Sequence, residues 1–175
     1  MSSPDRGSVL LIEVPEAEPA VREHRERLDE NARLGIPAHI TVLYPFLPAD
    51  AISAAVLARL EDVFAPVSAF GLRLDHTDWF GENVLWLGPE DPAPLAALTD
   101  LVWEAFPAFP PFQGQHEVVI PHLTVGHGHP LSDMRAAEES VSASLPVEAR
   151  VSTVTLMTEQ SAGGQWARSA SFALA

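Results

Sequence analysis

Two short segments of the chain each place a threonine two positions after a histidine. They read PAHITV, from residue 37, and IPHLTV, from residue 120, and the second histidine follows the first by 83 residues. Because side chains alternate between the two faces of a strand, His39 and Thr41 share one face, as do His122 and Thr124. We expect each segment to be a strand that buries its apolar residues and presents an imidazole and a hydroxyl group on its other face.

This pair of motifs is suited to the cleavage of a phosphodiester. Cleavage needs a base to activate the attacking oxygen and an acid to protonate the leaving oxygen. Two imidazoles, one neutral and one charged, supply both near neutral pH. Threonine hydroxyls can donate hydrogen bonds to the non-bridging oxygens as charge develops there. The sequence therefore predicts a metal-independent phosphodiesterase, with His39 and His122 catalytic and Thr41 and Thr124 binding phosphate. The alternative is that both motifs are core strands with buried, hydrogen-bonded histidines.

At these residues the sequence resembles the two-histidine (2H) phosphoesterases, which include bacterial 2′-5′ RNA ligase-like proteins and cyclic phosphodiesterases. The resemblance rests on the two H-x-T-hydrophobic motifs, their separation and the order of strands and helices, so it covers nearly the whole chain. It implies a bilobal α+β fold, no metal or other cofactor, and activity on 2′,3′-cyclic phosphates or 2′-5′ linkages. Two alternatives stay open, a non-catalytic module that binds a nucleotide or an RNA end and a 2′-5′ RNA ligase.

The sequence departs from the ligase-like pattern directly after the second motif. Ligase-like relatives often continue as H-x-T-h-x-R, whereas this chain continues as Val125-Gly126-His127. Together with the acidity of the chain, the missing arginine argues against the ligation of RNA ends and favours a small cyclic phosphate or a specialised substrate.

Two residues near the motifs are further candidates for contact with the substrate. Tyr44 follows the first motif and could stack on a nucleobase, although packing at the rim is the alternative. His127 follows the second motif and could contact phosphate. His127 could instead join His122 and His129 in a metal site, but their spacing matches no strong zinc pattern. We therefore predict no metal site.

The tryptophans and arginines of the predicted strands carry less information. The tryptophans are expected in the core, and the arginines in surface ion pairs, although one arginine could reach the phosphate. These residues are Trp79, Trp86, Trp166, Arg73, Arg150 and Arg168.

The composition excludes several classes of function. The 175 residues include no cysteine and no lysine, which excludes thiol chemistry, Schiff-base chemistry and lysyl-adenylate ligation. The net charge of −14 and the lack of a basic stripe argue against extended nucleic acid as a partner. The apolar run from Val9 to Ile12 is too short for a signal peptide or membrane span. We expect a cytoplasmic monomer that acts on a small cyclic-phosphate nucleotide or an RNA terminus and binds no membrane.

Hydropathy patterns place the motifs within an α+β fold of a single 1–175 domain. We expect two pseudo-symmetric lobes of duplicated strand–helix units, with two antiparallel-type sheets flanking a central cleft and the helices outside. A proline-rich loop is expected over Pro107–Gln115, and Gly163 and Gly164 in the last hairpin. The predicted strands are Ser8–Val14, Ala38–Tyr44, Phe70–Trp79, Val84–Leu87, Val118–Val125, Val147–Met157 and Trp166–Leu174, and the predicted helices are Glu18–Leu34, Ala51–Phe64, Asp91–Phe106 and Asp133–Leu145.

Overall fold

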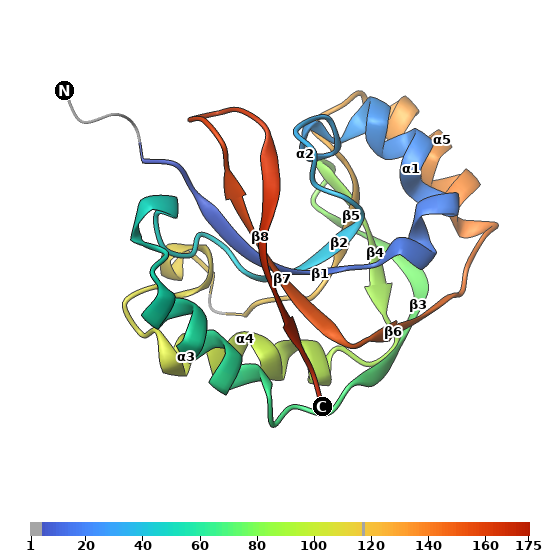
Figure 1. Ribbon diagram of the computed structural model, residues 1–175. Helices are drawn as coiled ribbons and strands as arrows, with labels where there is room; N and C mark the ends of the chain where they lie inside the picture. The colour runs from blue at the N-terminus through green and yellow to red at the C-terminus, as the bar shows by residue number, and fades with distance from the viewer. Residues whose placement is uncertain (1–4, 117) are drawn as a thin grey trace.

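The computed structural model describes residues 5–116 and 118–175, which form two four-stranded antiparallel sheets and five α-helices (Figure 1). The strand orders are β2-β1-β7-β8 and β5-β4-β3-β6. The predicted α+β class with two antiparallel sheets is therefore confirmed. The strands are β1 (Ser8–Glu13), β2 (His39–Leu43), β3 (Phe70–Phe80), β4 (Val84–Pro89), β5 (Leu123–His127), β6 (Val147–Val151), β7 (Thr153–Glu159) and β8 (Trp166–Ala173), and the α-helices are α1 (Glu18–Leu28), α2 (Glu30–Arg33), α3 (Ala54–Phe64), α4 (Ala93–Ala105) and α5 (Leu131–Ser142).

Each motif strand lies at the edge of a different sheet and pairs with one inner strand. β2 pairs with β1, so that Thr41 lies opposite Leu11. β5 pairs with β4, so that Thr124 lies opposite Trp86. Both inner strands are buried along almost their whole length, as the apolar run of β1 predicts. A buried inner strand fixes the register of the edge strand beside it, and thereby the face that each histidine and threonine occupies.

The helices pack on the outer sides of the two sheets. α4 packs on β2 and α3 on β8, whereas α1 packs on β5 and α5 on β3 (Figure 1). α1 follows β1 in the chain but covers the other sheet. β7 and β8 likewise return to the sheet that contains β1 and β2. Neither sheet with its helices is therefore a continuous half of the sequence.

Gly126 allows α1 and α5 to approach β5 closely. A Cβ atom at this position would lie 2.6 Å from Sδ of Met134 in α5 and 3.1 Å from Cβ of Leu28 in α1. Both distances are shorter than normal carbon contacts, so only glycine fits at this position without repacking. The glycine that stands in the second motif segment therefore serves helix packing.

Two predicted elements are wrong because the chain breaks inside them. The helix predicted over Glu18–Leu34 stops at Asp29, whose backbone is extended and whose carboxylate accepts a hydrogen bond from the Asn31 N–H to begin α2. The strand predicted over Val147–Met157 is two strands in different sheets, divided at Ser152. The division coincides with a break in the alternation of buried and exposed residues, because Ser152 and Thr153 are both exposed.

The predicted strand Val118–Val125 is also wrong in its first half. β5 begins only at Leu123, and the preceding residues form a loop in which Val118 is 72% exposed and Ile120 is 46% exposed. Apolar β-branched residues favour strands, but here no neighbouring strand pairs with them in the described part of the chain. None of the five α-helices within residues 5–116 and 118–175 is long and apolar enough to span a membrane.

Candidate active site

The two His-x-Thr motifs lie on the walls of one cavity between β2 and β5. The cavity encloses about 710 Å³ and is open to solvent at one side. All six residues that the sequence predicts for the site line it, namely His39, Thr41, Tyr44, His122, Thr124 and His127. A cavity of this size is within the range of about 300–1,000 Å³ that small-molecule sites occupy.

The burial of the motif residues alternates as the sequence predicts. In β2, His39 and Thr41 are half-buried at the cavity, whereas Ile40 is buried in the core on the other face. In β5, Thr124 is half-buried between Leu123 and Val125, which are both fully buried. Each motif is therefore held by apolar packing on one face and open to a ligand on the other. His122 lies just before β5 and is also half-buried.

Both imidazoles are held in the same tautomer by a backbone carbonyl two residues upstream. Nδ1 of His39 lies 2.8 Å from the carbonyl oxygen of Pro37, and Nδ1 of His122 lies 2.7 Å from that of Ile120. A carbonyl oxygen only accepts, so Nδ1–H donates in both cases. Nε2 of each ring has no hydrogen-bond partner within the described residues and is free to exchange a proton with a ligand. This arrangement gives two equivalent proton-transfer groups.

Burial makes both imidazoles less basic than a histidine in water. Burial is the largest effect on His39 and lowers its pKa from 6.5 to about 4, although the hydrogen bond to Pro37 raises it. The nearby charges of Arg25 and of His122 lower the pKa of His39 further, whereas the charge of Asp29 raises it. Burial also lowers the pKa of His122, against the opposite effect of its bond to Ile120. Burial therefore favours the neutral form of both rings.

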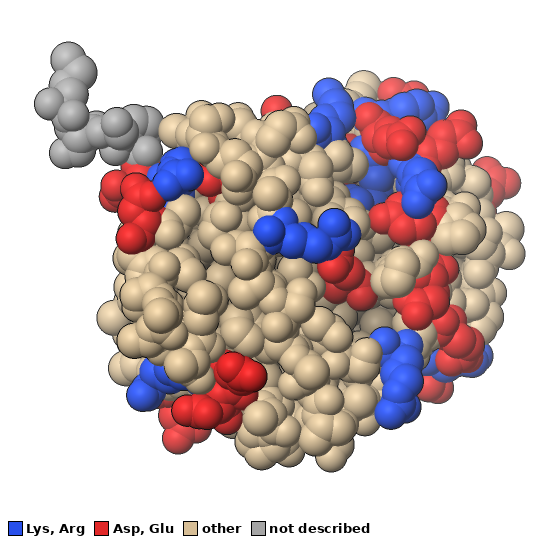
Figure 2. All heavy atoms as spheres, viewed as in Figure 1, with Lys and Arg blue, Asp and Glu red and all other residues tan. Residues whose placement is uncertain are grey.

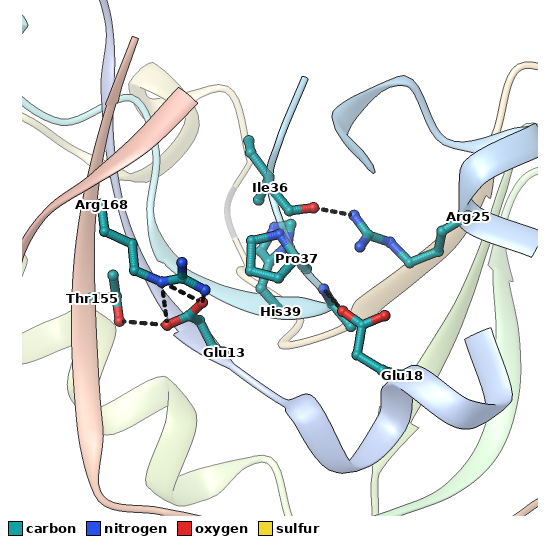
Figure 3. A network of polar contacts seen from close by, with 9 residues as sticks. Glu13, Glu18, Arg25, Ile36, Pro37, His39, Thr155 and Arg168 are labelled. Carbon is teal, nitrogen blue, oxygen red and sulfur yellow. Dashed lines mark hydrogen bonds and ion pairs between the residues drawn. The ribbon is translucent and has the colours of Figure 1, made fainter. Parts of the chain in front are cut away.

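Two side chains of α1 fix the segment before His39 (Figure 3). Arg25 donates to the carbonyl oxygen of Ile36 at 3.1 Å, and the Glu18 carboxylate accepts from the Ala38 N–H at 2.8 Å. Arg25 is itself buried and paired with the equally buried Asp29 at 3.0 Å. These contacts fix the backbone that carries the Pro37 carbonyl, so they orient the His39 ring.

The His122 ring is oriented by aromatic side chains instead. Phe80 at the end of β3 lies edge-to-face with it, with ring centroids 4.8 Å apart. Trp86 of β4 packs against it at 5.8 Å. Edge-to-face and tilted contacts of this kind restrict a ring to one orientation.

Several residues of the cavity wall were not predicted from the sequence. Trp166 was expected in the core, but it lines the cavity and lies edge-to-face with Tyr44 at 6.4 Å. The side chains of Phe112 and His116 come from the proline-rich loop and the segment just after it, for which no motif gives a signal. Asn31 of α2 and Phe80 of β3 complete the polar and aromatic parts of the wall.

The strand arginines lie outside the cavity. Arg73 pairs with Glu148, and Arg168 donates to Glu13 at 2.9 Å (Figure 3), in agreement with the expected surface ion pairs. Arg150 also lies outside the cavity wall. Within residues 5–116 and 118–175, no three His, Asp or Glu side chains gather closely enough to hold a metal ion.

Comparison with known proteins identifies a family for most of the chain. The family model described as the 2′-5′ RNA ligase superfamily matches residues 13–163. The chain is similar to the crystal structure of E. coli LigT in apo form, with 22% identity, a TM-score of 0.62 and 99% of each chain covered. It is also similar to TT0787 of Thermus thermophilus, with 17% identity, a TM-score of 0.66 and 97% of each chain covered.

E. coli LigT has also been solved with bound nucleotides. In the complex with 3′-AMP the identity is 20% and the TM-score 0.58, over 98% of this chain and 99% of LigT. Complexes with ATP and NADP+ are known as well. At these identities the similarity establishes the fold. No curated protein gives a significant match to the chain.

Proposed function

Because the chain belongs to the 2′-5′ RNA ligase superfamily of 2H phosphoesterases, we propose that it is a metal-independent phosphodiesterase that hydrolyses 2′,3′-cyclic phosphates or 2′-5′ phosphodiesters. The family supports a 2H phosphoesterase-type activity. The observation that carries the finer proposal is the pair of Nδ1-anchored imidazoles that line one cavity with two threonines. The LigT complexes with 3′-AMP, ATP and NADP+ support a small nucleotide as the ligand.

In the proposed reaction one imidazole takes a proton from water and the other gives a proton to the leaving group of the substrate. Nε2 of the neutral ring takes a proton from water, whose oxygen attacks phosphorus. The bond from phosphorus to the leaving ribose oxygen breaks, and Nε2–H of the charged ring protonates that oxygen. The products are a phosphomonoester and a free hydroxyl group. Thr41 and Thr124 donate hydrogen bonds to the non-bridging oxygens, where negative charge increases in the transition state.

Hydrolysis assays with 2′,3′-cyclic nucleotides and 2′-5′ linked dinucleotides test this proposal. Each imidazole transfers a proton in the transition state, so His39→Ala and His122→Ala should each lower kcat by about 10²–10⁴-fold. The double variant should lose less than the product of the two factors, because the pair acts as a unit. Thr41→Ala and Thr124→Ala should have milder effects on kcat and should also raise KM.

A matched control is provided by a histidine outside the cavity. His129 follows the second motif closely but does not line the cavity wall, so His129→Ala should keep wild-type rates. Circular dichroism should show that every variant is folded. If His39→Ala and His122→Ala are folded and keep near-normal turnover, the motifs are only core architecture. Ligand binding without turnover by the wild type would instead favour a non-catalytic binding module.

A further inference from the structure

The cavity wall carries no permanent charge in the described part of the chain. The chain has no lysine, and none of the described residues that line the cavity is an arginine, an aspartate or a glutamate. In the view of Figure 2 charged side chains are most dense over α1 and α5, with smaller charged groups at the left edge and in the centre. Among the described wall residues, a positive charge can therefore arise only when a histidine takes up a proton.

This limits the negative charge that the cavity can hold. A phosphodiester carries one negative charge, which a single imidazolium compensates. Burial disfavours a proton on both His39 and His122, so one proton on the pair is easier to hold than two. Each additional negative charge on the ligand would lose its hydration in the cavity without gaining a positive partner, and this desolvation costs free energy. The net charge of −14 adds long-range repulsion.

Apart from the histidines, Asn31, Thr41 and Thr124, the described part of the wall is apolar or aromatic. The rings of Tyr44 and Trp166 lie edge-to-face on one part of it. Phe112 lies on another part and has a φ of 49°, in the left-handed region that is costly for a bulky residue. Its N–H donates to the Tyr44 carbonyl at 2.7 Å, which holds it there. Strained backbone that presents a ring to a cavity is typical of a binding site rather than of a loop that only connects elements.

We propose that the cavity selects phosphodiesters that carry a single negative charge and an aromatic or apolar substituent, and that it discriminates against ligands with further phosphate groups. The inference rests on the proposed function and defines its substrate class. The preferred substrate is then a mononucleoside cyclic phosphate or a similar ester of an aromatic alcohol. Nucleoside polyphosphates and oligonucleotides with several phosphates should bind more weakly, because none of the described wall residues is a basic residue that compensates the further charges; LigT itself has been solved with ATP and NADP+.

Binding of ligands that are not substrates tests the charge selection independently of turnover. Adenosine 3′-methylphosphonate has one charge, adenosine 3′-phosphate has two and adenosine 3′,5′-bisphosphate has more, on the same nucleoside. Calorimetric titration at pH 7.5 should give a Kd that rises by at least about tenfold from the first ligand to the last. Ethyl methylphosphonate has the same charge without a base, and its Kd should be about tenfold or more above that of the adenosine ester.

A designed charge in the wall provides the matched variant. Asn31 is exposed at the cavity wall, so Asn31→Arg adds a guanidinium without burying it, and Asn31→Gln is the uncharged control. Asn31→Arg should lower the Kd of adenosine 3′,5′-bisphosphate by a factor at least about fivefold larger than its effect on the Kd of adenosine 3′-methylphosphonate. Asn31→Gln should not change the ratio of the two Kd values. Wild-type binding that is equal or tighter for the bisphosphate, or no binding of the singly charged ester, overturns the inference. If the affinities follow the expected order but the protein hydrolyses no phosphodiester, the inference about charge selection holds and the proposed function is wrong.

Discussion

The kcat/KM for a 2′,3′-cyclic nucleotide should pass through a maximum on the acid side of neutrality. Burial lowers the pKa of His39 to about 4 and lowers that of His122 below 6.5. The reaction requires one neutral and one charged ring. kcat/KM therefore falls below the first pKa of the pair, where both rings are charged, and above the second, where both are neutral.

The positions of the two limbs follow from these values. Because the pKa of His39 is about 4 and that of His122 is lowered below 6.5, the maximum of kcat/KM should lie below pH 6.5. At pH 7 the free protein therefore holds the single proton that the reaction needs less often than it would if both histidines had their ordinary pKa. The lowering of the pKa of His39 to about 4 corresponds to about 3 kcal/mol against the charged ring. A phosphate anion in the cavity offsets part of that energy, so the limbs of kcat should lie at higher pH than those of kcat/KM.

The assay is a set of initial rates from about pH 4 to pH 8 at constant ionic strength, with kcat and kcat/KM fitted separately. Circular dichroism at each pH shows whether the protein stays folded. In the residual activity of His39→Ala, the fall in kcat/KM at about pH 4 should be absent. A maximum of kcat/KM at or above pH 7, or superimposable profiles of kcat and kcat/KM, would refute the reasoning that burial controls the protonation of the pair.

Three further perturbations have outcomes that the structure predicts. Arg25→Met leaves the buried Asp29 carboxylate and the Ile36 carbonyl without the guanidinium that they contact. Denaturant titration should show that the unfolding free energy falls by about 3–5 kcal/mol and partly recovers when Asp29→Asn is added. A loss below about 1 kcal/mol would contradict this. Gly126→Val forces a side chain toward Sδ of Met134 and should lower the unfolding free energy by about 1–3 kcal/mol. The loss should be smaller when Met134→Ala is also present. Equal losses with and without Met134→Ala would show that this contact is not the cause. Turnover should be unchanged in excess chelator, and loss of activity that zinc or manganese restores would favour a metal-dependent hydrolase.

The sequence was sufficient to predict the motif residues because their arrangement is local. A strand alternates its side chains over any two-residue step, so His39 and Thr41 must share a face, and the apolar residues between them must occupy the other. The repeat at His122 and Thr124 then indicated two such strands, and the α+β class followed from the periodicity of the other segments. The breaks at Asp29 and Ser152 were missed because each depends on a side-chain cap or a change of sheet.

Only the tertiary structure brought distant segments together at the cavity. Trp166, from the last strand, and Phe112, from the proline-rich loop, reach the cavity although β8 lies at the opposite edge of the sheet from β2. The Trp166 N–H donates to the Leu34 carbonyl and the Phe112 N–H donates to the Tyr44 carbonyl, and these bonds hold both residues near the first motif. The crossing of α1 to the other sheet places Arg25 beside the backbone that orients His39. The sequence therefore determined which groups can transfer protons, because residue type and strand alternation are local properties. The fold decided how basic those groups are and how much charge surrounds them, because desolvation and electrostatic fields depend on atoms far apart along the chain.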